Sequence, residues 1–303
     1  MRVSIMGQAA FGEAVLKRLH ADGVDIVGVS APRDPSRPDA LWAAAEAAGI
    51  PTIETQSLKV PAGLDQWRAL EADLCVMAFV TDILAPEVFN VPALGTVQYH
   101  PSLLPLHRGS SAMNWAIINR DTVTGLTIFW PDQGIDTGPI LLQKDVNIGP
   151  EDTVGSLYFE QLFPAGVEAL SEAVRLVAEG GAPRAPQDHA QSTYEPPCRE
   201  EHAKIAWHAP ATELHALIRG CNPQPGAWTT FRDEKLSIFD VRLTGKQEPG
   251  MPGRVLRVDG DGFEVRLNGG VLRVLRVQPA GGKKVPAAEW AASVGLEDGF
   301  RFR

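Results

Sequence analysis

Short apolar runs alternate with helix-like segments through the first half of this 303-residue chain, and this alternation restricts the possible folds most strongly. Apolar runs occupy residues 2–6, 24–29 and 74–80, whereas residues 15–19 and 41–48 have apolar residues at helical spacing. Strands that alternate with helices are typical of β-α-β units, which build a parallel sheet covered by helices. We therefore predict an α/β fold with a Rossmann-like parallel sheet for the N-terminal part.

The pattern changes in the second half of the chain. Residues 181–201 carry several prolines and polar residues, which is typical of a linker. Beyond residue 226 the apolar runs are short and separated by Gly and Asp turns, as expected for a small β domain, barrel-like and of OB type. We predict a catalytic domain at 1–180, a linker at 181–204 and a β-barrel-like domain at 205–303.

Composition restricts the location and the partners. The formal net charge is −9 and no Lys/Arg-rich run is present, which argues against nucleic acid as a partner. No apolar run reaches the length of about 18 residues that spans a bilayer, and the N-terminus does not have the pattern of a secretory signal. Three widely spaced cysteines indicate reduced thiols rather than a disulfide framework. We expect a cytoplasmic protein that acts on a small molecule.

A glycine turn follows the first apolar run. The segment GQAAFG places Gly7 and Gly12 there, but Ala9 stands where a dinucleotide-binding fingerprint needs glycine. The Lys-Ser/Thr ending of a Walker loop is also missing, because Glu13 follows Gly12. A tight turn between a strand and a helix is therefore favoured over a phosphate site.

The densest group of chemically useful residues lies at 95–117, GTVQYHPSLLPLHRGSSAMNWAI, and at 130–143, WPDQGIDTGPILLQ. These segments resemble the formyltransferase family that uses 10-formyltetrahydrofolate, above all the N-terminal hydrolase domain of 10-formyltetrahydrofolate dehydrogenase and more distantly methionyl-tRNA formyltransferase. The resemblance extends over nearly the whole chain, through IMGQAAFG, FVTDILAP, DTVGSLY, IRGCNPQPGAW and VQPAGGKKVPAAEW.

The resemblance implies that His100 and Asp136 are the catalytic pair. Formyl transfer passes through a tetrahedral intermediate, so the site must accept a proton from the nucleophile and stabilise a negative oxygen. Imidazole exchanges protons near neutrality, and His100 stands at a strand end, where α/β sheets bind ligands. Asp136 can orient that imidazole or hold the attacking water. From the residues alone, a structural histidine and an Asp-Thr-Gly turn are the alternative.

Two positions depart from the family pattern. Gln98 stands where the tRNA enzymes carry Asn and the hydrolase domain an aliphatic residue, so its amide is a candidate oxyanion donor. The alternative is that the side chain faces elsewhere on the strand. Leu106 replaces an Arg that both relatives carry, whereas Arg108 and Gly109 match. Because that positive charge is missing here, the contacts that the family makes near this position do not all apply to this chain.

The resemblance also implies how the formyl donor, 10-formyltetrahydrofolate, is bound. A loop that wraps the pterin through backbone groups corresponds to 79–84, and the loop at 132–138 lines the same site. Phe79 and Leu104 are apolar walls of this site or, alternatively, core residues. The candidate donor-binding residues are Phe79, Val80, Thr81, Asp82, Ile83, Leu84, Leu104, Asp132 and Gly134.

No metal site is expected, because the remaining histidines have no ligand spacing with acidic residues or cysteine. His107 lies near the candidate site in sequence and is expected to be an exposed loop residue. The oligomeric state is left open.

The formyl acceptor remains open between several classes. Water or a small amine is favoured, and methionyl-tRNA is second because residues 30–42, SAPRDPSRPDALW, lack the basic density of a tRNA-binding loop. A non-catalytic folate or nucleotide binder is the third possibility, which conflicts with an intact His and Asp.

Overall fold

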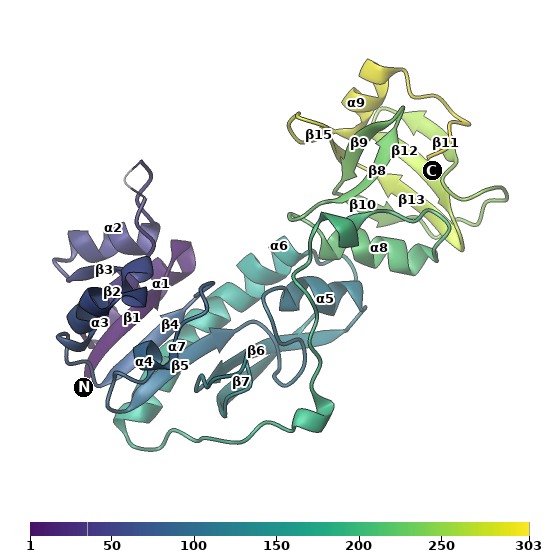
Figure 1. Ribbon diagram of the computed structural model, residues 1–303. Helices are drawn as coiled ribbons and strands as arrows, with labels where there is room; N and C mark the ends of the chain where they lie inside the picture. The colour runs from purple at the N-terminus through teal and green to yellow at the C-terminus, as the bar shows by residue number, and fades with distance from the viewer. Residues whose placement is uncertain (35, 303) are drawn as a thin grey trace. The chain divides into compact units, whose positions relative to one another are not determined.

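The computed structural model describes residues 1–34 and 36–302 (Figure 1). The chain forms two compact units that interleave along the sequence. The first unit comprises 1–110, 124–146 and 159–195, and the second comprises 111–123, 147–158 and 196–303.

The first unit is built on a seven-stranded sheet with the order β3-β2-β1-β4-β5-β6-β7. Strands β1 to β5 pair in parallel, and β6 is antiparallel to β5. The predicted α/β fold with a parallel sheet is thus confirmed. The strands are β1 Arg2–Gly7, β2 Asp25–Ala31, β3 Thr52–Glu54, β4 Leu74–Ala78, β5 Gly95–His100, β6 Val123–Phe129 and β7 Ile140–Asn147.

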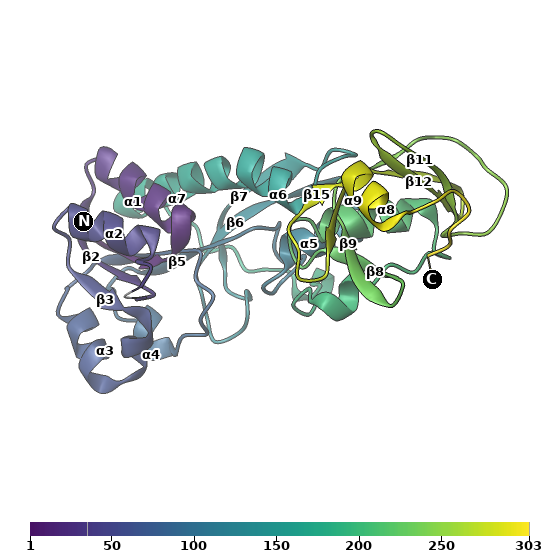
Figure 2. The ribbon, with the colours of Figure 1, turned by 90° about the horizontal axis from the view of Figure 1, so that it is seen from above.

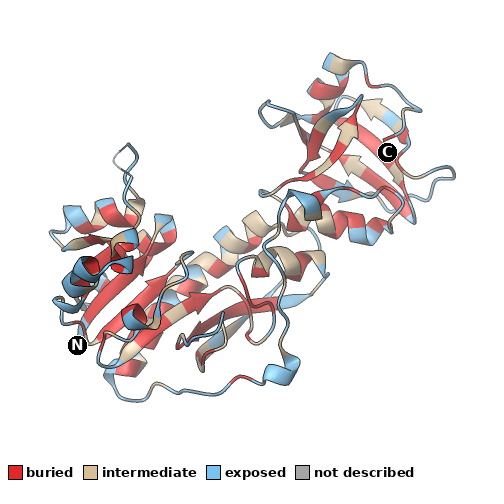
Figure 3. Cartoon of the chain, viewed as in Figure 1, coloured by how far each residue is buried: buried red, intermediate tan, exposed pale blue. Residues whose placement is uncertain are grey.

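Helices cover both faces of this sheet, so its central strands are buried on both sides, as Figure 3 shows for β1 and β4. In Figure 2, α1 and α7 lie on one side and α3 and α4 on the other. Gly166 of α7 permits a close approach to β5, since a Cβ there would lie 2.6 Å from the Tyr99 ring. The helices are α1 Ala9–Ala21, α2 Ala40–Ala47, α3 Pro61–Arg68, α4 Pro86–Phe89 and α7 Phe163–Ala178, with a 3₁₀ turn, η1, at Thr55–Lys59 and another, η3, at His189–Gln191.

The second unit holds two four-stranded sheets, β10-β13-β12-β11 and β15-β14-β9-β8. The small β domain expected from sequence is therefore present, and its strands pair antiparallel. The strand pairs of the described residues do not close into a single ring, so the OB-like barrel is not confirmed. The elements are α5 Ala112–Ile118, α6 Val154–Ser156, η4 Glu200–Ala203, α8 Ala211–Gly220, β8 Ala227–Phe231, β9 Glu234–Ile238, β10 Val241–Leu243, β11 Val255–Asp259, β12 Gly262–Leu267, β13 Gly270–Val274, β14 Arg276–Pro279, β15 Val285–Pro286 and α9 Ala287–Val294, and a π-helical segment, η2, spans Leu157–Leu162.

Two details of the second unit were not expected. The apolar runs at residues 236–243 and 271–277 are each divided into two strands that belong to different sheets. The final helix α9 buries Trp290 against the core formed by the strands.

Candidate active site

His100 is the last residue of β5, and its side chain is buried, with 5% of the residue exposed. The ring Nε2 lies 2.9 Å from the backbone oxygen of His107. A carbonyl oxygen only accepts hydrogen bonds, so Nε2 carries the proton and donates it. In the neutral ring, Nδ1 is consequently the atom that can accept a proton.

Asp136 faces that nitrogen from the loop between β6 and β7. Its Oδ2 lies 3.6 Å from His100 Nδ1, and the backbone N–H of Gly109 donates to the same oxygen over 2.8 Å. The distance between Nδ1 and Oδ2 exceeds a hydrogen bond, but one small molecule could contact both atoms. Asp136 adopts a φ of 54°, a left-handed conformation that is costly for a non-glycine residue and often occurs at functional sites.

The geometry of the loop between β6 and β7 also depends on Gly138. A Cβ on Gly138 would lie 1.8 Å from the backbone oxygen of Trp130, so no side chain fits there without moving the backbone. The carboxylate of Asp132 accepts from the N–H of Gly134 and from the hydroxyl of Thr137, which closes the same loop. The side chain of Asp132 thus supports the loop that carries Asp136.

His107 is not an exposed loop residue, and that expectation is wrong. It is buried, has a φ of 53°, and its Nδ1 lies 3.2 Å from a carboxylate oxygen of Glu195. The reason is tertiary: Glu195, nearly ninety residues later, returns to cover it. Neighbouring Leu106, which replaces the family Arg, is largely exposed.

Gln98 lies two residues before His100 on β5, so both side chains project from the same face of the strand. Gln98 is half-buried, whereas His100 is buried. This register is compatible with an amide that points toward the same reacting atoms as His100.

The loop at 79–84 directly follows β4. The Thr81 hydroxyl accepts from Gln8 Nε2, and the Asp82 carboxylate accepts from Gln56 and Lys59. The side chains of Thr81 and Asp82 are therefore bonded within the protein itself.

The apolar side chains of this region differ in exposure. Phe79 and Ile83 are exposed, Ile83 at 85%, whereas Val80 and Leu84 pack against the core beside α3 and α4. Leu104 is only 2% exposed, which agrees with the interpretation of this residue as part of the core. Phe79 and Ile83 are the members of the predicted set that present apolar surface.

Gln187 is a residue of this site that the sequence did not predict. It lies in the segment expected to be a linker, yet it is buried and donates to the backbone oxygen of Asp136 over 2.9 Å. A glutamine in a polar, Pro-rich stretch carries no local signal of such a role.

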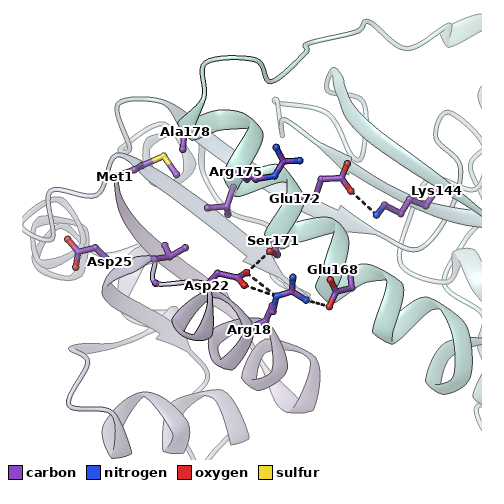
Figure 4. Close-up of a pocket in the computed structure, with 13 residues that line it drawn as sticks. Met1, Arg18, Asp22, Asp25, Lys144, Glu168, Ser171, Glu172, Arg175 and Ala178 are labelled. Atoms are coloured by element: carbon purple, nitrogen blue, oxygen red, sulfur yellow. Dashed lines mark hydrogen bonds and ion pairs between the residues drawn. The ribbon is translucent and has the colours of Figure 1, made fainter.

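A cavity of about 670 Å³ lies elsewhere in the first unit, lined largely by α7 and by residues 22–25, which follow α1 (Figure 4). Its cationic side chains are paired with acids in the protein: Arg18 with Asp22 and Glu168, Lys144 with Glu172, and Arg175 with Glu179. His100 and Asp136 do not line it, so it is not the candidate active site.

The glycine turn after β1 is structural. A Cβ on Gly7 would lie 2.1 Å from the backbone oxygen of Ala78 on β4. The carboxylate of Asp39 accepts from the N–H of Ala9 at the start of α1. An acid at this helix end would repel a phosphate, which agrees with the interpretation as a turn.

Within residues 1–34 and 36–302, no three His, Cys, Asp or Glu side chains are grouped to hold a metal ion. Over the same residues, no helix has the length and apolar character needed to cross a membrane.

Two protein-family models match this chain. Residues 1–174 match the family model described as formyl transferase, and residues 198–295 match its C-terminal domain. The chain therefore belongs to the formyl transferase family of enzymes.

Two relatives show the range within that family. The chain is 39% identical to cytosolic 10-formyltetrahydrofolate dehydrogenase of Xenopus laevis over 96% of its own length but 34% of that protein. It is 36% identical to methionyl-tRNA formyltransferase of Moorella thermoacetica over 96% of its length and 95% of that protein. The chain thus spans about a third of the dehydrogenases it matches.

Solved structures share the fold. HypX from Aquifex aeolicus in complex with tetrahydrofolic acid matches with a TM-score of 0.73 at 16% identity, over 98% of this chain and 48% of that one. The N-formyltransferase from Helicobacter canadensis, in complex with folinic acid and dTDP-3-aminofucose, matches with a TM-score of 0.68 at 18% identity, over 90% and 98% of the two chains.

Proposed function

We propose that the protein transfers the formyl group of 10-formyltetrahydrofolate to water, giving tetrahydrofolate and formate, or to a small amine. The observation that carries this proposal is the buried pair of His100 Nδ1 and Asp136 Oδ2, 3.6 Å apart on a fold of the formyl transferase family. Acyl transfer to a nucleophile needs a group that accepts a proton and returns it, and a carboxylate beside that group stabilises its charged form.

The first half of the reaction is nucleophilic attack. A water or amine that contacts both Nδ1 and Oδ2 loses a proton to this pair as its oxygen or nitrogen bonds to the formyl carbon. The formyl C=O electron pair moves onto oxygen and gives a tetrahedral anion. His100, charged after accepting a proton, stabilises that anion, and the negative charge of Asp136 stabilises the imidazolium.

The second half is expulsion of the folate nitrogen. The C–N10 bond breaks, its electrons go to N10, and the imidazolium returns the proton there. The products are tetrahydrofolate and either formate or a formamide. Gln98, on the same strand face as His100, is proposed to donate an amide hydrogen to the anionic oxygen.

The donor is proposed to bind beside the loop at 79–84, together with Leu104, Asp132 and Gly134. Exposed Phe79 and Ile83 supply apolar surface for the pteridine ring, while backbone groups of the loop supply hydrogen bonds. Leu104 acts from the interior beneath the site, and Asp132 and Gly134 act through the loop that they shape.

Two observations bear on the acceptor. The net charge of −9 favours water or a small amine over tRNA, because the chain as a whole repels phosphate. One relative that matches over nearly its full length is, however, a methionyl-tRNA formyltransferase. Methionyl-tRNA is therefore the second candidate acceptor.

We further propose the domain division at 1–180, 181–204 and 205–303, an OB-like C-terminal barrel and a cytoplasmic location. These rest on the sequence patterns and on the family's two-part organisation.

The decisive experiment mixes purified protein with 10-formyltetrahydrofolate and no acceptor, and follows tetrahydrofolate and formate. Formation of both, absent in His100→Ala, supports hydrolysis. Bound folate without turnover rejects water, and amines, small ones first and methionyl-tRNA second, are then supplied. If no acceptor supports turnover, the protein is a folate binder and the proposed reaction is wrong.

A further inference from the structure

One buried side chain stands out in a segment that is otherwise accessible. Of the residues described between 181 and 197, Gln187 is the one that is buried, at 6% exposure. A buried amide must satisfy its hydrogen bonds within the protein, because an unpaired one costs free energy. The partners of Gln187 therefore indicate what the segment does.

The partners of Gln187 lie both on the loop that carries Asp136 and on the segment that follows His100. The Gln187 amide nitrogen donates to the backbone oxygens of Asp136, over 2.9 Å, and Gly138, over 2.7 Å. Its amide oxygen accepts from the guanidinium of Arg108 over 2.7 Å. Gln187 thus joins the loop that carries Asp136 to the segment that follows His100.

The connection continues to the carboxylate and the imidazole. Gly109, next to Arg108, donates its N–H to Asp136 Oδ2, and the His107 oxygen accepts from His100 Nε2. The same returning segment also holds His107, through the hydroxyl of Thr193 on its N–H and the carboxylate of Glu195 on its ring.

We propose that Gln187 is a positioning residue that sets the distance between Asp136 and His100. Its two donated bonds hold the loop in the left-handed conformation at Asp136, and its accepted bond fixes that loop to Arg108. This inference rests on the proposed function, because the distance matters through the reaction of that pair. Gln187 itself does not touch either reacting side-chain atom.

Two variants distinguish the hydrogen bonds that Gln187 donates from the space that its side chain fills. Gln187→Glu keeps the length and the acceptor for Arg108 but loses both donors, and Gln187→Met keeps the approximate volume alone. Both are expected to lower kcat by about 10²-fold with KM for the folate changed by less than about three-fold, as misplacement of a reacting group predicts. If Gln187 only filled space, Gln187→Met would keep kcat within about three-fold of the original protein, and the proposal would be overturned.

Two controls exclude loss of stability as the cause. Gln191→Ala changes an exposed glutamine of the same segment, whose amide nitrogen binds Asp188. Thr55→Val removes a buried hydrogen bond between Thr55 and Ser30. Ser30 belongs to β2, which lies three strands away from β5 in the sheet order, so this bond is remote from His100. Both are expected to retain kcat within about three-fold, and Thr55→Val is expected to lower the melting temperature by a similar amount to Gln187→Met.

A readout without turnover separates failure of this inference from failure of the proposed function. The ¹⁵N signals of the His100 imidazole, assigned by their loss in His100→Gln, are recorded for the original protein and Gln187→Met. A changed chemical shift supports positioning even if no acceptor gives turnover. Unchanged His100 signals overturn it, whatever the activity.

Discussion

Replacement of Asp136 by asparagine tests the charge that the mechanism assigns to this residue. The change keeps the side-chain shape, and the amide oxygen can still accept from the N–H of Gly109. The negative charge beside His100 disappears. The loop conformation should therefore survive while the electrostatic contribution is lost.

The magnitude follows from the distance between the two groups. For opposite unit charges 3.6 Å apart, Coulomb's law with an effective dielectric constant of about 20 gives an attraction of about 5 kcal/mol. Both side chains are nearly buried, so solvent screening is limited. Each 1.36 kcal/mol changes the rate about ten-fold, and the expected loss in kcat/KM is therefore roughly 10³- to 10⁴-fold.

The assay measures kcat/KM for 10-formyltetrahydrofolate with the acceptor that supports turnover, alongside the melting temperature. The matched control is Asp145→Asn, which removes an exposed charge on β7; its kcat/KM should change by less than about three-fold. A loss below about ten-fold in a well-folded Asp136→Asn variant would refute the role of the carboxylate charge.

Two further predictions concern Gln98 and His215. Gln98→Ala should lower kcat by about ten-fold, less than loss of Asp136, because one amide donor is auxiliary to the imidazole; an unchanged kcat removes Gln98 from the site. Burial foremost, and then the nearby Arg219 charge, lower the pKa of His215, while Glu151 acts in the opposite direction. Because the folded-state pKa is lowered, the unfolded chain binds more protons below the ordinary histidine pKa of about 6.5, and stability falls as the pH drops through that value. Unfolding free energies from pH 8 to 5 should fall less steeply for His215→Gln than for the original protein, and parallel curves would contradict this.

Local sequence patterns determined much of the first unit. The alternation of apolar runs and helical segments predicted a parallel sheet, and the structure has five parallel strands flanked by helices. Such patterns succeed because burial on both faces of a strand requires a continuous apolar run, which is visible in the sequence. In the second unit the pattern predicted strands but not their division between two sheets, which depends on partners distant along the chain.

For the site, the resemblance carried by the HPSLLP and GIDTG motifs predicted His100 and Asp136, and the fold places His100 Nδ1 3.6 Å from Asp136 Oδ2. The sequence did not show which ring nitrogen faces the carboxylate. That orientation depends on the backbone oxygen of His107, which no side-chain pattern records.

The sequence by itself therefore determined the sheet-forming segments and the residue types able to carry formyl transfer, since both are local properties. Only the tertiary structure decided that His107 is buried beside Glu195 and that Gln187 holds the loop of Asp136. Those contacts join residues separated by about fifty positions or more, and a polar, Pro-rich segment has the same composition whether it is free in solvent or bound to the site. The physical reason is that burial of an amide depends on the partners that the fold supplies.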